Sequence, residues 1–251
     1  MRFRQKNATE TDRTWIGTVM KFVTWNCAMA LQKKYQGFLT LGADLMVIQE
    51  CSQAFIEQIN RSEGWSSAWF GNNPNKGLAV LVRAPWLIRE AQALKLKWAG
   101  RLVIDGRESI ELFPAWACKG DSPAEEYVGQ IHLLLDMIEQ TGLSPLAIVA
   151  GDFNSNSIWD SDYGIKNHSS AVDRFRKLGL ESAYHVFSGD PQGSERYKTH
   201  WNMKKKDAAY HVDYAFLSRP LLPRLREVVV GRCDDWLSLS DHSPVLVELD
   251  L

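Results

Sequence analysis

The sequence is poor in cysteine, and the cysteines that it has are scattered. It contains only Cys27, Cys51, Cys118 and Cys233, which lie far apart and form no CxxC pair. This spacing argues against a finger-type zinc site and against a disulfide framework. We expect buried, reduced thiols, which are typical of cytoplasmic proteins.

Long apolar runs are also missing. No stretch of about 18 apolar residues occurs in the chain, so no transmembrane helix is predicted. Residues 1–19 carry charges but lack the apolar segment of a secretory signal. An apolar, strand-like run begins at residue 22, so we interpret residues 1–19 as a non-core extension before a single domain at 20–251.

An excess of charge of one sign is absent as well. The chain has 29 Lys and Arg against 30 Asp and Glu, a formal net charge of −1. This balance gives no support for a protein that coats DNA through its overall charge. It does not exclude an enzyme that guides a phosphate with a local basic rim.

What remains is the composition of a globular protein. The 251 residues are 45% hydrophobic and include 10 Trp, with no internal repeat and no Pro/Gly/Ser-rich linker. A chain of this length can bury a sizeable core without disulfides or a structural metal. We therefore expect one domain.

Short apolar runs, typical of buried strands, alternate with segments of helical periodicity. The predicted strands are 22–25, 45–48, 66–70, 78–82, 87–97, 101–105, 109–118, 146–149, 212–217 and 244–249. The predicted helices are 31–41, 53–61, 124–140 and 171–177. Asp105-Gly106 is a strong hairpin signal between two of the strands. Many strands with helices between them favour a two-layer β core flanked by helices.

Polar side chains stand where apolar strands begin or end. Their positions are Asn26, Glu50, Asp152 with Asn154, Asp213, and Asp241 with His242. Each alone is readily explained as a cap or turn residue. Together they are better explained as loop chemistry held on a rigid support.

Spacing adds a geometric argument. Asp152 and Asn154 are two residues apart, so in extended backbone they face the same side. His211 and Asp213 have the same spacing and alternate with apolar residues of the next strand. An acidic side chain in that position needs a partner, and His242 is the obvious candidate.

The residue types point to hydrolysis. Carboxylate and amide oxygens suit Mg²⁺ or Mn²⁺. A carboxylate such as Asp152 can orient and deprotonate an attacking water. A His–Asp pair supplies a stabilised imidazole beside developing negative charge.

Five segments in this order resemble the endonuclease/exonuclease/phosphatase superfamily, which includes deoxyribonuclease-like enzymes, abasic-site endonucleases, inositol phosphatases and sphingomyelinases. The segments read Val-Thr-Trp-Asn at 23–26, Val-Ile-Gln-Glu at 47–50, Gly-Asp-Phe-Asn at 151–154, His-Val-Asp-Tyr at 211–214 and Ser-Asp-His-Ser at 240–243. The resemblance implies a four-layer α/β sandwich, in which two packed mixed β-sheets are flanked by helices.

The resemblance also implies residue roles. Glu50 is similar to the principal metal ligand, with Asn26 and Asp241 near the metal. Asp152 resembles the residue that activates the water, and Asn154 the amide that holds the scissile phosphate. His242, oriented by Asp213, resembles the group that stabilises the transition state or assists the leaving oxygen. Mg²⁺ is the implied cofactor, with Mn²⁺ as a substitute.

One position departs from the family pattern. Many members place a His or Tyr at the end of the strand before the long helix, where this chain has Trp116, followed by Lys119. We assign Trp116 to the aromatic slot and Lys119 to its polar neighbour. Indole donates one hydrogen bond but shuttles no proton, so the identity of the leaving-group acid is open.

Further substrate-side candidates have equally ordinary explanations. His200 and Trp201 precede a run of three lysines, which reads as a loop that binds phosphate and stacks on a base, or as a solvated basic turn. Trp159 follows Asn154 closely, and His211 lies two residues before Asp213. For the other tryptophans we favour packing.

Three functions compete. The favoured one is a divalent-metal-dependent nuclease that acts on DNA or RNA. The first alternative is a phosphatase or phosphodiesterase for a small molecule or lipid headgroup, and the second is a catalytically silent binding protein on the same scaffold. No membrane span and no obligate protein partner are implied.

Overall fold

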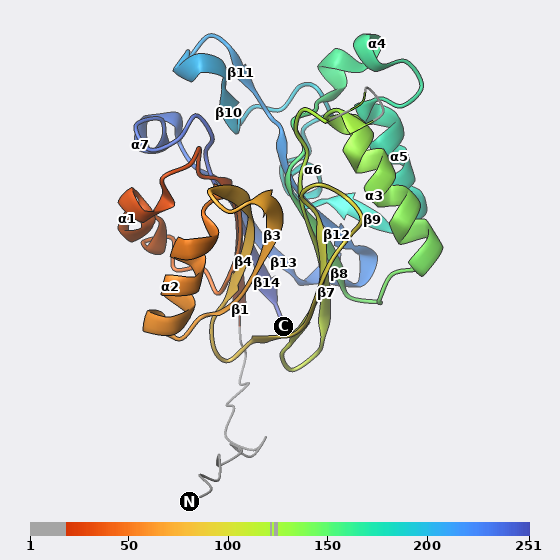
Figure 1. Cartoon of the computed structure of the whole chain (residues 1–251). Helices are drawn as coiled ribbons and strands as arrows, with labels where there is room; N and C mark the ends of the chain where they lie inside the picture. Colours follow the sequence, from red (N-terminus) through yellow and green to blue (C-terminus); the bar gives the residue numbers. More distant parts are fainter. Residues whose placement is uncertain (1–18, 121, 123–124) are drawn as a thin grey trace, which may run out of the picture.

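The computed structural model describes residues 19–120, 122 and 125–251. Two six-stranded sheets pack face to face, and helices cover the two outer faces (Figure 1). Both sheets contain parallel and antiparallel neighbours. The predicted four-layer sandwich of two mixed sheets is therefore confirmed.

The first sheet brings the two ends of the domain together. Its strand order is β13-β14-β1-β2-β4-β3. The strands are β1 (Val19–Asn26), β2 (Leu45–Cys51), β3 (Ser66–Asn73), β4 (Lys76–Val82), β13 (Leu225–Val230) and β14 (Val245–Asp250). β1 runs parallel to β2 and antiparallel to β14. The carboxyl ends of β1 and β2 therefore lie at the same edge of the sheet.

The second sheet has the strand order β5-β6-β7-β8-β12-β9. The strands are β5 (Leu87–Ala93), β6 (Gly100–Asp105), β7 (Ile110–Trp116), β8 (Ala147–Asp152), β9 (Leu180–Ser182) and β12 (Asp213–Ser218). β6 and β7 form the predicted hairpin around Asp105-Gly106. In the register of β8 and β12, Asp152 lies directly opposite Asp213.

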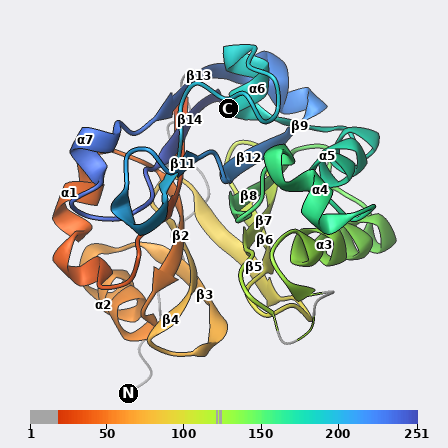
Figure 2. The same ribbon diagram turned by 90° about the horizontal axis from the view of Figure 1, so that it is seen from above.

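Helices and a small hairpin complete the fold. They are η2 (Leu31–Lys33), α1 (Tyr35–Leu39), α2 (Gln53–Glu63), α3 (Val128–Thr141), η4 (Ser157–Trp159), α4 (Asp160–Tyr163), α5 (His168–Lys177), α6 (Ala183–Ser188), β10 (His200–Trp201), η5 (Asn202–Lys204), β11 (Ala209–Tyr210), η6 (Arg219–Arg224) and α7 (Cys233–Trp236). Seen from above, α1, α2 and α7 lie beside the first sheet, and α3, α4 and α5 beside the second (Figure 2).

Three apolar clusters fill the layers. The central one lies between the sheets and includes Val47, Ile148 and Val247. A second packs the first sheet against its outer helices, and a third packs the other sheet against α3 and α5. Central strands buried on both faces explain the unbroken apolar runs of the sequence.

Several expectations need correction. The helix predicted at 31–41 is split at Lys34 into η2 and α1. The helix predicted at 124–140 begins at Val128, and position 124 lies outside the described residues. Val19, which was predicted to lie in the N-terminal extension, belongs to β1 and pairs with Asp250, while residues 1–18 of that extension lie outside the described residues.

Two further findings concern the cysteines and the helices. All four cysteines are free thiols. Among the described residues, no helix has the length and apolar character needed to cross a membrane.

Candidate active site

The polar residues predicted at the strand ends converge at one end of the two sheets, where they form a group that we call the polar cluster. Asn26 closes β1, Asp152 closes β8 and Asp213 opens β12, while Glu50 lies near the end of β2. His242 lies in the segment just before β14. Because the sheets pack face to face, these side chains approach one another from both layers.

Asp152 is the centre of the arrangement and is completely buried. One of its oxygens, Oδ2, accepts hydrogen bonds from the side-chain amides of Asn26 and Asn154, each at 2.9 Å. Its other oxygen, Oδ1, accepts from the backbone N–H of Asn154, also at 2.9 Å. The carboxylate is thus held in one orientation.

The side chains of Asp152 and Asn154 are in contact, as predicted, but the backbone at Asn154 is not extended. Asn154 lies outside the strand with a left-handed φ of 45°. The chain therefore folds back in a tight turn and does not continue extended. The Asn154 amide also donates to the carbonyl of Ala117 at 2.8 Å, which fixes its side chain at the mouth of the site.

Asp213 and His242 form the predicted pair. The Nδ1 atom of His242 lies 3.0 Å from Oδ2 of Asp213, and both residues are buried. Nε2 of His242 lies 4.0 Å from Oδ2 of Asp152. The imidazole therefore stands between two buried carboxylates.

Burial and charge shape the ionisation of this group. Burial, above all, raises the pKa of Asp152 to about 7, and the carboxylate of Asp213 adds to the rise. Burial would lower the pKa of His242, but Asp213 and Asp152 outweigh it and raise that pKa to about 10. At neutral pH His242 is a cation and Asp152 titrates, which are properties of a functional site.

Glu50 reaches the same cluster from a strained backbone. Its φ is 62°, and the pairing of β2 with β4 is shifted by a bulge between Gln49 and Cys51. A bulge re-aims a side chain, and here it brings Oε1 of Glu50 to 3.3 Å from the amide of Asn26. Strain of this kind in a non-glycine residue is typical of functional sites.

Lys76 was not anticipated from the sequence. Its Nζ lies 3.2 Å from Oε2 of Glu50 and 4.9 Å from the ring centroid of Trp116. The ammonium therefore supplies the local counter-charge of Glu50. Lys76 stands at the start of β4 beside a turn, where no sequence pattern marked it.

Asp241 and His200 form the opposite rim. The Asp241 side chain is 34% exposed, and its Oδ2 lies 4.0 Å from Nε2 of His200. The His200 ring stands 4.4 Å from the ring of His242. Burial and the charge of His242 lower the pKa of His200 to about 4, so His200 is neutral.

Asp152, Asp213 and His242 offer ligand atoms within 4.8 Å of one another, a spacing that can hold a metal ion. Asp213 and Asp152 raise the pKa of His242 and so favour its protonated form, which has no free lone pair for a metal. Glu50 and Asp241 instead present partly exposed carboxylates, 19% and 34% accessible. They are the oxygen donors best suited to a divalent cation.

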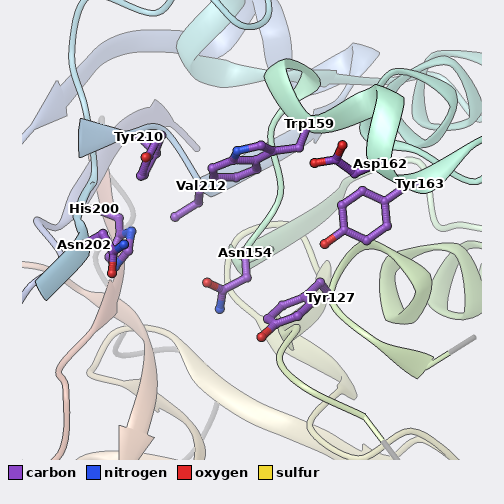
Figure 3. A pocket seen from close by; sticks show the side chains of 9 residues that line it. All are labelled: Tyr127, Asn154, Trp159, Asp162, Tyr163, His200, Asn202, Tyr210 and Val212. Atoms are coloured by element: carbon purple, nitrogen blue, oxygen red, sulfur yellow. The ribbon is translucent and has the colours of Figure 1, made fainter. Parts of the chain in front are cut away.

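An open hollow of about 430 Å³ adjoins the cluster (Figure 3). Nine side chains line it: Tyr127, Asn154, Trp159, Asp162, Tyr163, His200, Asn202, Tyr210 and Val212. Asn154 and His200 belong both to this hollow and to the polar cluster. The hollow therefore borders the polar cluster at Asn154 and His200.

The other substrate-side candidates are placed variously. Trp159 and His200 line the hollow, and Lys119 is exposed beyond β7. Trp116 is only 3% exposed and packs against Trp98, with ring planes tilted by 42°. Trp201 is also buried.

His211 does not join the site. It is 1% exposed, and its ring packs against Tyr184, with centroids 4.4 Å apart. Its Nδ1 atom lies 2.8 Å from the carbonyl of Tyr197. His211 therefore anchors the segment that leads into the β10–β11 hairpin.

The sequence was compared with family profiles and with curated proteins. The profile of the Endonuclease/Exonuclease/phosphatase family matches residues 23–242, which include every residue of the polar cluster. No curated protein sequence gives a significant match.

Solved structures share the architecture. A 3′ phosphatase from Neisseria, bound to a product DNA hairpin, has a TM-score of 0.69 and 19% identity, covering 92% of this chain and 100% of its own. An AP endonuclease from Archaeoglobus fulgidus has a TM-score of 0.65 and 18% identity, with coverage of 92% and 100%. The APE2 catalytic domain of Xenopus laevis has a TM-score of 0.69 and 16% identity, with coverage of 92% and 93%. At these identities the likeness establishes the fold.

Proposed function

The chain belongs to the endonuclease/exonuclease/phosphatase family, and on this premise we propose that it is a divalent-metal-dependent nuclease. It acts on phosphoester bonds, and the bond we assign is the phosphodiester of DNA or RNA. One observation carries the proposal: Asp152 is buried, held by two amides, and faces the Asp213–His242 pair.

We assign the activation of water to Asp152. Its pKa of about 7 lies close to the working pH, which is the best match for a general base. Asn26 and Asn154 fix the carboxylate, so the lone pair that accepts the proton has a defined direction. We also assign Asn154, at the mouth of the site, to the scissile phosphate, for which its amide would exchange one of its bonds to Asp152 and Ala117.

We assign charge stabilisation to His242. As a buried imidazolium paired with Asp213, it places a fixed positive charge and an N–H donor beside the phosphate. Preorganised charge of this kind is worth about 10²–10³ in turnover. The neutral ring of His200 packs against the ring of His242.

Glu50 and Asp241 would hold the metal, with Asn26 orienting Glu50. The fit rests on donor chemistry, because both residues offer partly exposed carboxylate oxygens, and on charge, because the buried carboxylates of Asp152 and Asp213 belong to the same site. We assign Mg²⁺, with Mn²⁺ as a substitute. When bound, the cation polarises phosphoryl oxygens and offsets developing negative charge.

DNA is the preferred substrate in this proposal. The Neisseria protein of the same fold is seen with a DNA hairpin, and aromatic side chains border the cluster here. The few and widely separated cysteines favour a reducing compartment, and we place the protein in the cytoplasm.

A substrate panel tests the proposal. Single-stranded and duplex DNA, RNA, inositol phosphates and a chromogenic phosphodiester are each incubated with Mg²⁺. We expect hydrolysis of DNA, lowered by about 10²-fold or more in Asp152→Asn. The control Asp173→Asn, at an exposed position of α5, should match the wild type.

The panel also separates the alternatives. Faster turnover of inositol phosphates than of any nucleic acid would favour the small-molecule phosphatase. Binding of DNA without hydrolysis of any substrate would favour the silent scaffold. Wild-type rates in Asp152→Asn would refute the role of that residue.

A further inference from the structure

The hollow beside the polar cluster is built by elements that are far apart in the sequence. Tyr127 precedes α3, Trp159 ends η4, Tyr163 ends α4, and His200 and Tyr210 come from the β10–β11 hairpin. Their side chains converge on one space (Figure 3). Its volume, about 430 Å³, lies within the range of small-molecule pockets, about 300–1,000 Å³.

The charge of the lining argues against a phosphate in this space. Among the described residues that line it, none is Lys or Arg, and Asp162 adds a carboxylate. Phosphate sites use cationic side chains or free backbone N–H groups. The hollow therefore suits an uncharged neighbour of the phosphate that Asn154 would hold.

The aromatic lining indicates what that neighbour is. Tyr127, Trp159, Tyr163 and Tyr210 all contribute to the wall. The rings of Trp159 and Tyr210 contact each other at an angle, with centroids 4.8 Å apart and planes tilted by 56°, and both line the hollow. Nucleic-acid bases bind aromatic rings by stacking.

Polar groups at the edge complete the pattern. Asn202 and His200 offer donors and acceptors, Asp162 offers acceptors, and Asn154 offers its amide oxygen, since its two amide hydrogens bond Asp152 and Ala117. A base removed from its stack is recognised by contacts to its hydrogen-bonding edge together with aromatic stacking. An apolar pocket without these groups would suit a lipid chain better.

We propose that this hollow binds the base of an unpaired nucleotide whose phosphate is the one cleaved. This inference rests on the proposed nuclease function and adds the substrate class, an unpaired or terminal nucleotide. A base inside a duplex must leave its stack to enter, so single-stranded and frayed ends are the preferred substrates.

The test compares p-nitrophenyl esters of thymidine 3′-phosphate and thymidine 5′-phosphate with the matched esters of base-free deoxyribose phosphate. The ratio of kcat/KM with and without the base measures the advantage of the base. Stacking on an aromatic side chain predicts a ratio of about 5- to 150-fold for one of the two esters.

Variants assign that advantage to the hollow. In Trp159→Ala the ratio should fall close to one, while Trp159→Phe should retain most of it. Phe187→Ala is the matched control, because Phe187 is 49% exposed on α6 and does not line the hollow. A wild-type ratio near one for both esters, or an unchanged ratio in Trp159→Ala, would overturn the inference.

A binding measurement separates this inference from the proposed function. A single-stranded oligonucleotide that contains 2-aminopurine is titrated with each protein, because stacking quenches its fluorescence without any turnover. Quenching by the wild type but not by Trp159→Ala, with no hydrolysis of any ester, would sink only the nuclease. Hydrolysis with neither quenching nor a base advantage would sink only the base site.

Discussion

At the scale of single residues, the site works through two buried carboxylates that share one imidazolium. Asp152 and Asp213 lie opposite each other in neighbouring strands, and His242 contacts Asp213 and lies near Asp152. Their titrations are coupled, so a pH profile reports the group as a whole. The charges and distances within the group still predict whether the pKa of one member rises or falls when another member is replaced.

The pH–rate profile should be bell-shaped. Asp152 accepts a proton only when ionised, so kcat/KM rises as pH passes about 7. His242 stabilises charge only when protonated, so kcat/KM falls as pH passes about 10. In Asp213→Asn one negative charge is lost, which lowers both pKa values and moves both limbs to lower pH.

The profile is measured with a chromogenic diester for wild type and variant under saturating metal. An alkaline limb that stays in place in Asp213→Asn would contradict the assigned pairing.

Lys76 makes a second prediction at this scale. Its ammonium lies 3.2 Å from Glu50 and competes with a cation for that carboxylate. Lys76→Met should therefore tighten Mn²⁺ binding about two- to fivefold, the range of a partly exposed ion pair. Calorimetric titration measures it, with Lys177→Met, an exposed position at the end of α5, as the control.

Weaker Mn²⁺ binding in Lys76→Met than in the control would show that Lys76 instead holds Glu50 in its binding conformation.

Sequence reasoning found the carboxylates, amides and His242 because such residues at strand ends form a pattern. It missed Lys76, Tyr127 and Tyr210, which reach the site from a turn, a helix start and a short hairpin. Their positions follow from how loops fold across the sheet edge, and no periodicity records that. His211 shows the converse: spacing grouped it with Asp213, but burial directs it elsewhere.

At the scale of elements, two irregularities in strands position the site. The bulge at Glu50 turns its side chain toward Asn26. Gly151 has a φ of 151°, and a Cβ at this position would lie 1.7 Å from the carbonyl oxygen of Ala115 in β7. The glycine lets β7 and β8 approach closely just before Asp152.

Gly151→Ala should therefore destabilise the protein by about 2 kcal/mol or more, because backbone of β7 or β8 must move. Gly37→Ala is the control, since its Cβ would meet only Leu239 at an ordinary 3.8 Å. Denaturant midpoints compare the two. Equal stability of Gly151→Ala and wild type would mean that the strands yield freely.

Long periodic segments were predictable, while short ones were not. Most apolar runs became strands, because burial between layers demands continuous apolar sequence. β9, β10 and β11 have two or three residues each, too few to show a period. The helix expected at 31–41 is interrupted at Lys34, whose ammonium bonds the carbonyls of Cys27 and Ala28.

At the scale of the whole molecule, the first sheet ties the ends of the domain together. β14 lies between β13 and β1, and its side chains Val247 and Leu249 enter the central core. The fold is therefore closed only when the last strand is in place. We propose that residues 20–251 form one cooperative unit together with Val19.

Denaturation should show one transition, with Trp fluorescence and far-UV circular dichroism coinciding. Deletion of residues 1–18 should leave melting temperature and activity unchanged, because the described residues from Val19 onward already contain both complete sheets and the polar cluster. Two separate transitions, or a clear loss of stability on deletion, would contradict this organisation.

The most direct test of the account is metal-dependent hydrolysis of a chromogenic phosphodiester. The wild-type protein is stripped with EDTA, assayed, and then titrated with Mg²⁺ and Mn²⁺ beside Glu50→Ala. We predict no activity in EDTA, full recovery with either metal, and a loss of about 10²-fold or more in Glu50→Ala. Activity that survives EDTA, or wild-type recovery in Glu50→Ala, would contradict the account.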